Sequence, residues 1–336
     1  MRKGPVRFDY YLDKLGILLE RAARDHNPAL FLYKNDARTP LFMLEALCRL
    51  HRDLHNNKKF NALKDQFKIL EDALGAIDYY DAYANQFLKH PMVPVHIREY
   101  MQGQAREKIQ HLNTVLTDGD WLTANGRLKA IRKKLKEAEW LQPKEEAKGI
   151  KKIYDKAIDK INAFVREEGA GNFTEMENQV HEFRRELRWL SIYPQALRGS
   201  IQTLDSGESE TATAAYLIPE IVQSKFNIMP DAGDNKWFLL LEKNYFYALS
   251  WLIAELGKLK DEGLQYFAAA EALQQTAGFS SEEAFEKSFE VFGVEKNMYD
   301  SLLTRASLIT KTFIKEENLD KLVLGTARIE KSTNKE

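Results

Sequence analysis

The chain has little of what would place it outside ordinary globular proteins. Cys48 is the single cysteine among 336 residues, which excludes an intramolecular disulfide. Its place in an apolar helical pattern favours a buried thiol over a nucleophile. Residues 1–20 contain no uncharged apolar block, and no later window approaches membrane-spanning length. We therefore expect a cytoplasmic protein that has no membrane partner.

The chain also lacks an excess of charge of one sign, since 49 Lys and Arg face 50 Asp and Glu. The charges are unevenly distributed: residues 127–160 hold twelve Lys and Arg against six Asp and Glu, and residues 127–136 hold six cations and no acid. Such a local basic face can bind polyanions even in a neutral protein. Its alternative interpretation is the solvated face of a helix. The candidates here are Arg132, Lys133 and Lys136.

Alternating runs rich in β-branched residues are nearly absent, whereas apolar residues recur at spacings of three and four almost everywhere. This pattern predicts an all-α protein. The expected helices lie near residues 9–25, 40–56, 59–89, 94–117, 120–140, 144–168, 174–198, 211–225, 236–257, 259–276, 281–292 and 296–316. Segments 206–213 and 229–235 are rich in Gly, Pro, Ser and acids, which is typical of loops.

The helix expected at 174–198 carries the strongest chemical signal. At about 100° per residue, its cations fall on one stripe roughly 100° wide. They are His181, Arg184, Arg185 and Arg188. The opposite face is apolar, and Thr174 to Glu177 matches a capping box, as does Ser280 to Glu283 further along. The stripe predicts a phosphate ligand held by side chains.

The same stripe has a simpler interpretation. Glu182 lies three residues before Arg185 and Glu177 four before His181, so each cation can pair with a carboxylate on its own helix. Each such pair is worth only a few tenths of a kcal/mol. The stripe would then be a solvated helix face without a ligand.

One segment recurs loosely: residues 70–78 contain Leu74-Gly75, and residues 253–261 contain Leu256-Gly257. A glycine within a helix costs about 1 kcal/mol relative to alanine, so its reuse at matched places suggests a close helix crossing or a kink. The echo predicts two similar halves, of which residues 40–56 and 174–198 would be the equivalent first helices. Chance likeness between two amphipathic helices is the alternative.

The order of these features resembles the CHAD domain, the conserved-histidine α-helical domain. His181, Arg184 and Arg188 match its second-half basic positions, while Leu256 to Asp261, and Leu74-Gly75 with Asp81, resemble its two helix ends. The resemblance implies two pseudo-repeated antiparallel four-helix halves that bind inorganic polyphosphate in a basic channel between them. The organisation implied is an N-terminal helix and linker at 1–37, halves at 38–170 and 171–275, C-terminal helices at 276–330 and a tail at 331–336.

The sequence departs from the family pattern mainly in the first half. Leu41 and Leu44 stand where the histidine and the first arginine are expected, which leaves Arg49 and Arg52. Asp78 and, in the second half, Ser191 replace further basic residues. The resemblance therefore implies a channel whose basic lining is reduced on one side.

These patterns lead to the hypothesis of a non-enzymatic module that binds a polyanion, inorganic polyphosphate before nucleic acid, and needs no cofactor and no metal. The 181–188 stripe would orient the ligand, with Lys260, Arg49 and the 127–136 helix in support. One alternative is a helical scaffold or protein-interaction domain that has lost the anion site. Another is a HEPN-like helical ribonuclease, because arginines precede His26 and His51. His51 and His55, four residues apart, could also share a metal.

Overall fold

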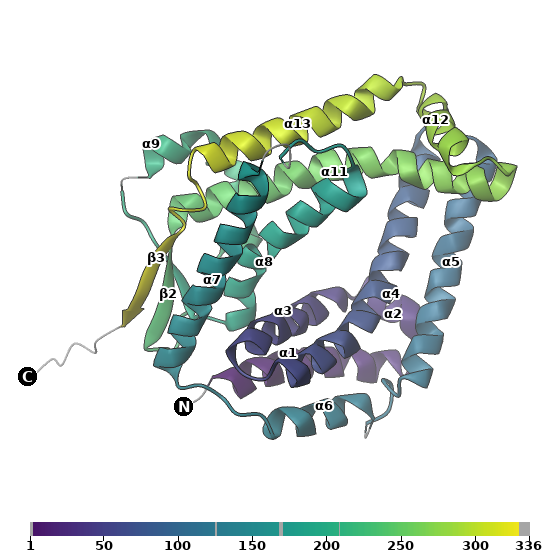
Figure 1. Cartoon of the computed structure of the whole chain (residues 1–336). Helices are drawn as coiled ribbons and strands as arrows, with labels where there is room; N and C mark the ends of the chain where they lie inside the picture. Colours follow the sequence, from purple (N-terminus) through teal and green to yellow (C-terminus); the bar gives the residue numbers. More distant parts are fainter. Residues whose placement is uncertain (1–2, 125, 168–170, 208, 329–336) are drawn as a thin grey trace, which may run out of the picture.

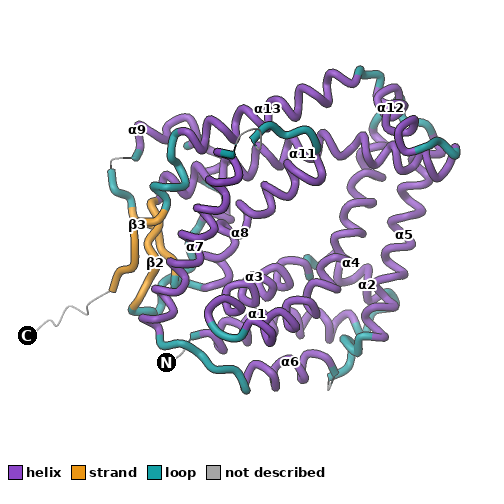
Figure 2. The backbone as a smooth tube through the Cα atoms, in the orientation of Figure 1, coloured by secondary structure: helices purple, strands orange, loops and turns teal. Residues whose placement is uncertain are grey.

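A computed structural model of the chain describes residues 3–124, 126–167, 171–207 and 209–328, and this part is mostly helical (Figures 1 and 2). The predicted tail at 331–336 lies outside the described residues. Thirteen α-helices are described: α1 (Gly4–Ala22), α2 (Pro28–Lys34), α3 (Arg38–Leu54), α4 (Asn57–Lys89), α5 (Val95–Asp118), α6 (Arg127–Lys136), α7 (Pro143–Arg166), α8 (Glu182–Leu197), α9 (Glu210–Thr213), α10 (Pro219–Val222), α11 (Lys243–Ala277), α12 (Ser281–Phe292) and α13 (Lys296–Lys315).

The prediction of an all-α protein is wrong in one respect, since the described residues include a three-stranded sheet in the order β1-β2-β3. Strand β1 (Ile201–Leu204) runs parallel to β2 (Trp237–Glu242), and β3 (Val323–Arg328) pairs antiparallel with β2. Residues 237–242 are a nearly continuous apolar run, which cannot be told from a buried helical turn by periodicity. Pairing between segments far apart in the chain decided its conformation.

The first helices form a layered bundle. The long helices α4 and α5 lie side by side, joined by only five residues, which makes them antiparallel. Helix α3 packs between α1 and α4. Phe60, Phe67 and Leu74 are fully or almost fully buried at successive seven-residue steps along α4, so one apolar face of this helix enters the core.

The longest helix is α11, which spans 35 residues where the sequence predicts two helices. It contacts α12, α13, α8 and α5, and so connects the C-terminal helices with the first bundle (Figure 1). Helices α12 and α13 begin and end within one residue of prediction. The capping box at Ser280 and Glu283 is confirmed, since both of its hydrogen bonds are present.

Helix α8 begins differently from the prediction. A π-helical segment, η1 (Met176–His181), precedes it, and the capping box expected at Thr174 and Glu177 is wrong. The side chain of Gln179 accepts hydrogen bonds from the backbone N–H groups of Thr174 and Glu175 instead. The Met176 N–H donates to the Tyr299 hydroxyl, 3.2 Å away. A different local side chain, Gln179, and one tertiary partner, Tyr299, thus replace the predicted cap.

Other differences from prediction are local. Helix α2 was not predicted, the basic helix is limited to α6, and region 211–225 forms short pieces, among them η2 (Ala214–Tyr216) and η3 (Lys225–Asn227). Within the described ranges, no helix has both the length and the apolar character needed to cross a bilayer.

The prediction of two equivalent halves stays a prediction. Helix α3 precedes α4, which carries Gly75, and α8 precedes α11, which carries Gly257. Helices α3 and α8 pack against each other, and buried apolar residues from both predicted halves join one cluster. The site described next lies where these two helices meet.

Candidate anion-binding groove

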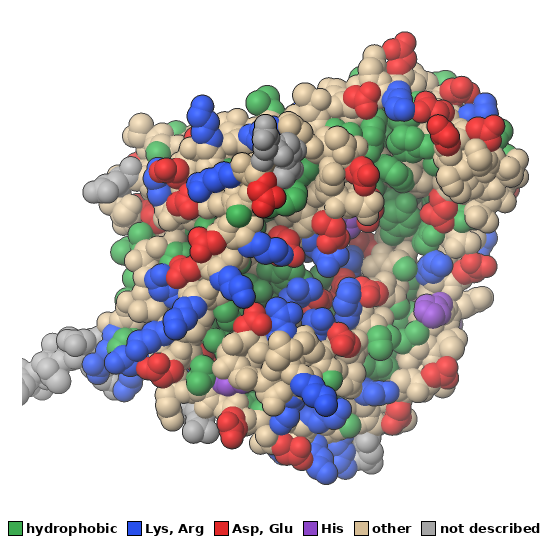
Figure 3. All heavy atoms as spheres, in the orientation of Figure 1, with side chains coloured by type: hydrophobic (Ala, Val, Ile, Leu, Met, Phe, Trp, Pro, Cys, Tyr) green, Lys and Arg blue, Asp and Glu red, His purple; other side chains and the backbone are tan. Residues whose placement is uncertain are grey.

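A groove of about 160 Å³ lies between α3, α4 and α8. Two helices present a stripe to it with steps of four, three and four residues, the spacing of one helical face. The stripes are Arg38, Phe42, Glu45 and Arg49 on α3, and His181, Arg185, Arg188 and Ile192 on η1 and α8. Helix α4 adds Lys68, Glu71 and Asp72. Figure 3 shows basic and acidic side chains gathered around the central hollow of this face.

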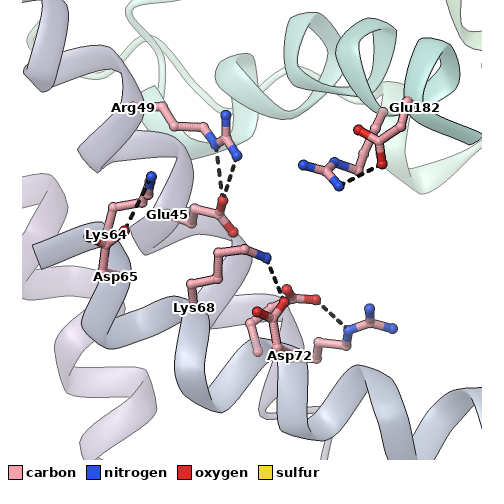
Figure 4. Close-up of polar contacts among 10 residues, drawn as sticks. Glu45, Arg49, Lys64, Asp65, Lys68, Asp72 and Glu182 are labelled. Carbon is pink, nitrogen blue, oxygen red and sulfur yellow. Dashed lines mark hydrogen bonds and ion pairs between the residues drawn. The ribbon is translucent and has the colours of Figure 1, made fainter. Parts of the chain in front are cut away.

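On the α3 and α4 side, every cation of the groove is held by a carboxylate. Arg38 Nε lies 2.8 Å from Glu71 Oε1, and Arg38 Nη1 lies 2.9 Å from Asp78 Oδ2. Arg49 Nη2 lies 2.9 Å from Glu45 Oε1 (Figure 4). The Glu71 side chain is only 7% exposed, and burial raises its pKa while Arg38 opposes the rise. This side of the groove is therefore compensated.

Lys68 on α4 completes that side. Its Nζ lies 2.5 Å from Asp72 Oδ1, one turn further along the helix (Figure 4). The Arg49 guanidinium also lies 4.2 Å from the ring centroid of Trp189 on α8, a cation–π contact that joins the two walls.

On the α8 side, two cations pair as the solvated-face interpretation predicts. His181 Nδ1 lies 3.1 Å from Glu177 Oε1, and Arg185 Nη1 lies 2.8 Å from Glu182 Oε1. The hydrogen bond with His181 lowers the pKa of Glu177. Both Arg185 and Glu182 are more than 40% exposed, so their pairing is weak and open to competition.

Arg184 and Arg188 are half-buried, contrary to the expectation of a solvent-exposed stripe. Arg184 Nε donates to the Ile253 carbonyl at 2.9 Å. The guanidinium lies against Gly257, where an added Cβ would come within 3.0 Å of Nε. The glycine of the Leu-Gly pair thus provides the space in which α11 receives this arginine.

Arg188 differs from the other arginines of the groove. Its guanidinium lies 5.2 Å from the Phe42 ring centroid, and Arg38 lies 5.1 Å from the same ring. No carboxylate or other hydrogen-bond acceptor of the described chain pairs with that guanidinium. Desolvation, followed by repulsion from Arg184 and Arg38, lowers the pKa of Arg188 to about 10. Glu71 opposes this shift without forming an ion pair with Arg188, which is charged at neutral pH.

Several predicted residues lie away from the groove. Lys260 Nζ pairs with Asp261 at 2.6 Å, and its charge acts on Glu177 without lining the groove. Helix α6 packs on α1 through buried Ile131 and Leu135 (Figure 1).

This packing decides which cations of α6 pair with α1 and which face solvent. Arg132 pairs with Asp9 and Asp13 of α1 at 2.9 and 2.6 Å. Lys133 and Lys136 face solvent on α6. The structure thus separates the basic helix from the 181–188 stripe.

The sequence reasoning missed Arg38, Phe42 and Lys68. Steps of seven and four residues back from Arg49 lead along one helical face to Arg38, so the stripe on α3 was readable. Leu41 and Leu44 are both fully buried in the core and do not line the groove. Ser191 lines a neighbouring cavity, and Asp78 pairs with Arg38.

The histidine pair of the metal alternative lies in an aromatic part of the core. His51 is fully buried among Phe8, Phe60 and Trp140. Its ring stacks on that of His55, and neither of its nitrogens has a hydrogen-bond partner in the described structure. Burial lowers its pKa well below the usual value. Across the described residues, no group of three or more His, Cys, Asp or Glu could hold a metal ion.

The chemistry of the groove is that of charge recognition. Six of its lining residues are Lys, Arg or His, three are carboxylates, and no lining residue is a Ser, Thr or Cys. Arginine can direct two N–H donors at phosphate or carboxylate oxygens. Comparison with protein-family models, curated proteins and solved structures finds no match to this chain.

Proposed function

We propose that this protein is a non-enzymatic binding protein for a phosphate-rich polyanion, with inorganic polyphosphate as the preferred ligand, and that the groove between α3, α4 and α8 receives it. The cations outnumber the carboxylates along the lining, and they come from three helices that converge on one hollow. A polyanion site needs such convergence, because one stripe of charge is screened within about 10 Å by salt.

The observation that carries the proposal is the state of Arg188. A half-buried guanidinium without a carboxylate partner, facing Arg184 and Arg38, raises the electrostatic potential where a phosphate would enter. Charge-assisted phosphate contacts are worth about 1.5 to 3 kcal/mol each. An anion would satisfy Arg188 and relieve the repulsion between it and its neighbours.

The paired cations would join by exchanging partners. The side chains of Arg185 and Lys68 are 41% and 35% exposed. An incoming phosphate can therefore compete with Glu182 for Arg185 and with Asp72 for Lys68. This competition weakens each added contact and makes the affinity depend strongly on salt. The resemblance to the CHAD domain belongs to the same proposal, because it implies the same ligand in the same place.

A second candidate function is a helical scaffold without a ligand. It is favoured by the compensation of Arg38, Arg49, Lys68 and Arg185, each of which already has a carboxylate partner. The two functions differ in whether the groove binds phosphate at all.

The test is filter binding of long-chain polyphosphate, RNA and DNA at two salt concentrations, with two variants that each lose two charges. The R185A/R188A variant, which removes two arginines that line the groove, should bind polyphosphate at least tenfold more weakly than the parent and with a flatter salt dependence. The matched control K133A/K136A removes two exposed charges from α6 and should bind within about threefold of the parent.

Two results would contradict the proposal. Equal weakening by both double variants would mean that the attraction is general and the groove is not the site. Absence of polyphosphate binding by the parent at low salt would favour the scaffold. Tighter binding of RNA than of polyphosphate would mean that RNA is the preferred ligand, with the groove still as its site.

A further inference from the structure

A second cavity, of about 330 Å³, lies on the neighbouring face of α8. It is bounded by α8, by the segment from α10 to η3, by α11 and by Met43 of α3. Arg188 lines both this cavity and the groove, whereas Arg184 lines only this one. Most of its lining residues therefore differ from those of the groove.

The charged wall consists of two arginines and no acid. Arg184 uses Nε on the Ile253 carbonyl, and its terminal nitrogens have no acceptor among the described residues. None of the residues that line the cavity is Asp or Glu. The nearest carboxylates act from outside: Asp261 on Arg184, and Glu71 on Arg188. Both are already paired with other cations, so the cavity keeps its positive charge.

The polar wall is held in place by its own hydrogen bonds. Ser250 Oγ donates to Asn227 Oδ1 at 2.7 Å, and Asn227 Nδ2 donates to the Ile221 carbonyl at 2.8 Å. Gln195 Nε2 donates to the Ile228 carbonyl at 2.7 Å. These bonds tie the segment around η3 to α8 and α11, so the cavity is formed before any ligand enters.

The remaining wall is apolar. Ile253 and Ile221 are buried beside the arginines, and Met43, Ile192 and Ala254 extend the same surface. Phe226 lies at the rim and is 71% exposed, next to Ile228, which is 65% exposed. Two exposed large apolar side chains beside a cationic cavity suit a ligand with an anionic head and an apolar body.

We infer that this cavity binds a phosphate monoester with a short apolar body, its phosphate between Arg184 and Arg188 and its body along Ile253 and Ile221 beneath Phe226. A phosphate monoester carries about −1.5 to −2 charges at pH 7, which matches two guanidinium groups better than a carboxylate does. The inference goes beyond the polyanion site, because the cavity, the ligand class and most of the residues differ.

The test is calorimetric titration of the whole protein with octyl phosphate, octanoate, inorganic phosphate and octyl glucoside. Octyl phosphate should bind at least tenfold more tightly than inorganic phosphate, which lacks the apolar body, and than octyl glucoside, which lacks the charge. Octanoate should fall between octyl phosphate and octyl glucoside. Equal affinities for octyl phosphate and inorganic phosphate would overturn the assignment of the apolar wall.

Three variants locate the site. A254F fills the cavity from a half-buried position on α11 and should abolish octyl phosphate binding while polyphosphate binding is kept. F226A changes only an exposed ring and should weaken octyl phosphate about fivefold, with inorganic phosphate unchanged. K68A, in the groove alone, should leave octyl phosphate affinity unchanged.

The variants also separate the two proposals. Unchanged octyl phosphate affinity in both A254F and F226A would overturn the inference. Loss of polyphosphate binding in K68A, with octyl phosphate binding intact, would show two sites. Should A254F unfold, F226A alone decides, because its side chain lies at the surface.

Discussion

The two longest helices, α4 and α11, each carry a glycine that makes room for an arginine of a neighbouring helix, but the two arginines differ in how their charge is compensated. We call α3 with α4 the first arm and α8 with α11 the second arm. On α4, Gly75 makes room for Arg38, whose Nη2 would lie 2.8 Å from an added Cβ; on α11, Gly257 does the same for Arg184. Arg38 then reaches Glu71 and Asp78, whereas Arg184 reaches only the Ile253 carbonyl. Arg188, beside Arg184, has no ion pair among the described residues, and the Glu71 carboxylate that acts on it is already paired with Arg38.

The difference shows that the position of a cation and its availability are separate properties. Helix spacing and a facing glycine bring an arginine to the centre of the molecule in both arms. Whether that arginine can bind a ligand depends on acids from other elements. In the first arm these acids neutralise the arginine, and in the second they are missing, so the anion chemistry is concentrated around α8.

The strongest way to test this contrast is to remove in turn the two arginines that lie against these glycines, Arg38 and Arg184. R38A leaves Glu71, whose side chain is 7% exposed, without its main partner. It should lower the free energy of unfolding by about 2 kcal/mol, less than for a fully buried pair because Arg38 is 35% exposed. R184A removes only a bond to a carbonyl and should cost about 1 kcal/mol or less. Urea denaturation measures both, and equal losses would contradict the contrast.

The buried histidine of α3, His51, predicts a pH dependence of stability. Burial lowers the pKa of His51 of α3 well below 6.5, whereas the unfolded chain titrates near 6.5. The unfolded state therefore binds the proton more readily below that pH. The free energy of unfolding is therefore unaffected by His51 above about pH 6.5. It decreases as the pH falls below that value, by at most about 1.4 kcal/mol per pH unit for one histidine.

The matched variant is H51F, which keeps an aromatic ring among Phe8 and Phe60 and removes the titration. The loss of stability between pH 7 and pH 5, followed by urea denaturation, should be smaller in H51F than in the parent. Part of the dependence will remain because burial also lowers the pKa of His55. Parallel curves for parent and variant would mean that His51 does not titrate as its burial requires.

The smallest expected effect concerns Arg188 itself. Its lowered pKa means that the folded state disfavours its charge at neutral pH, so R188M should keep or raise the free energy of unfolding, by up to about 1 kcal/mol. Loss of the cation–π contact with Phe42 offsets part of this gain. A fall of the melting temperature by several degrees in R188M would show that Arg188 is structural and would remove the contrast between the arms.

The sequence by itself determined most of the helices and the chemistry of the central stripe. Helices α4, α5, α12 and α13 follow from apolar residues at spacings of three and four, and Ser280 with Glu283 fixes the start of α12. These are interactions within a few residues of each other, so they can be read along the chain. His181, Arg185 and Arg188 face one groove for the same reason.

Tertiary structure decided everything that depends on distant partners. It made residues 237–242 a strand by pairing them with 201–204 and 323–328. It placed α6 against α1 and away from the stripe, through Ile131 and Leu135. It paired Arg38 with Glu71 and Asp78, which lie 33 and 40 residues further along the chain on α4, and brought no acid within ion-pair distance of Arg188 among the described residues. Charge pairing across elements depends on packing geometry, which local periodicity does not contain.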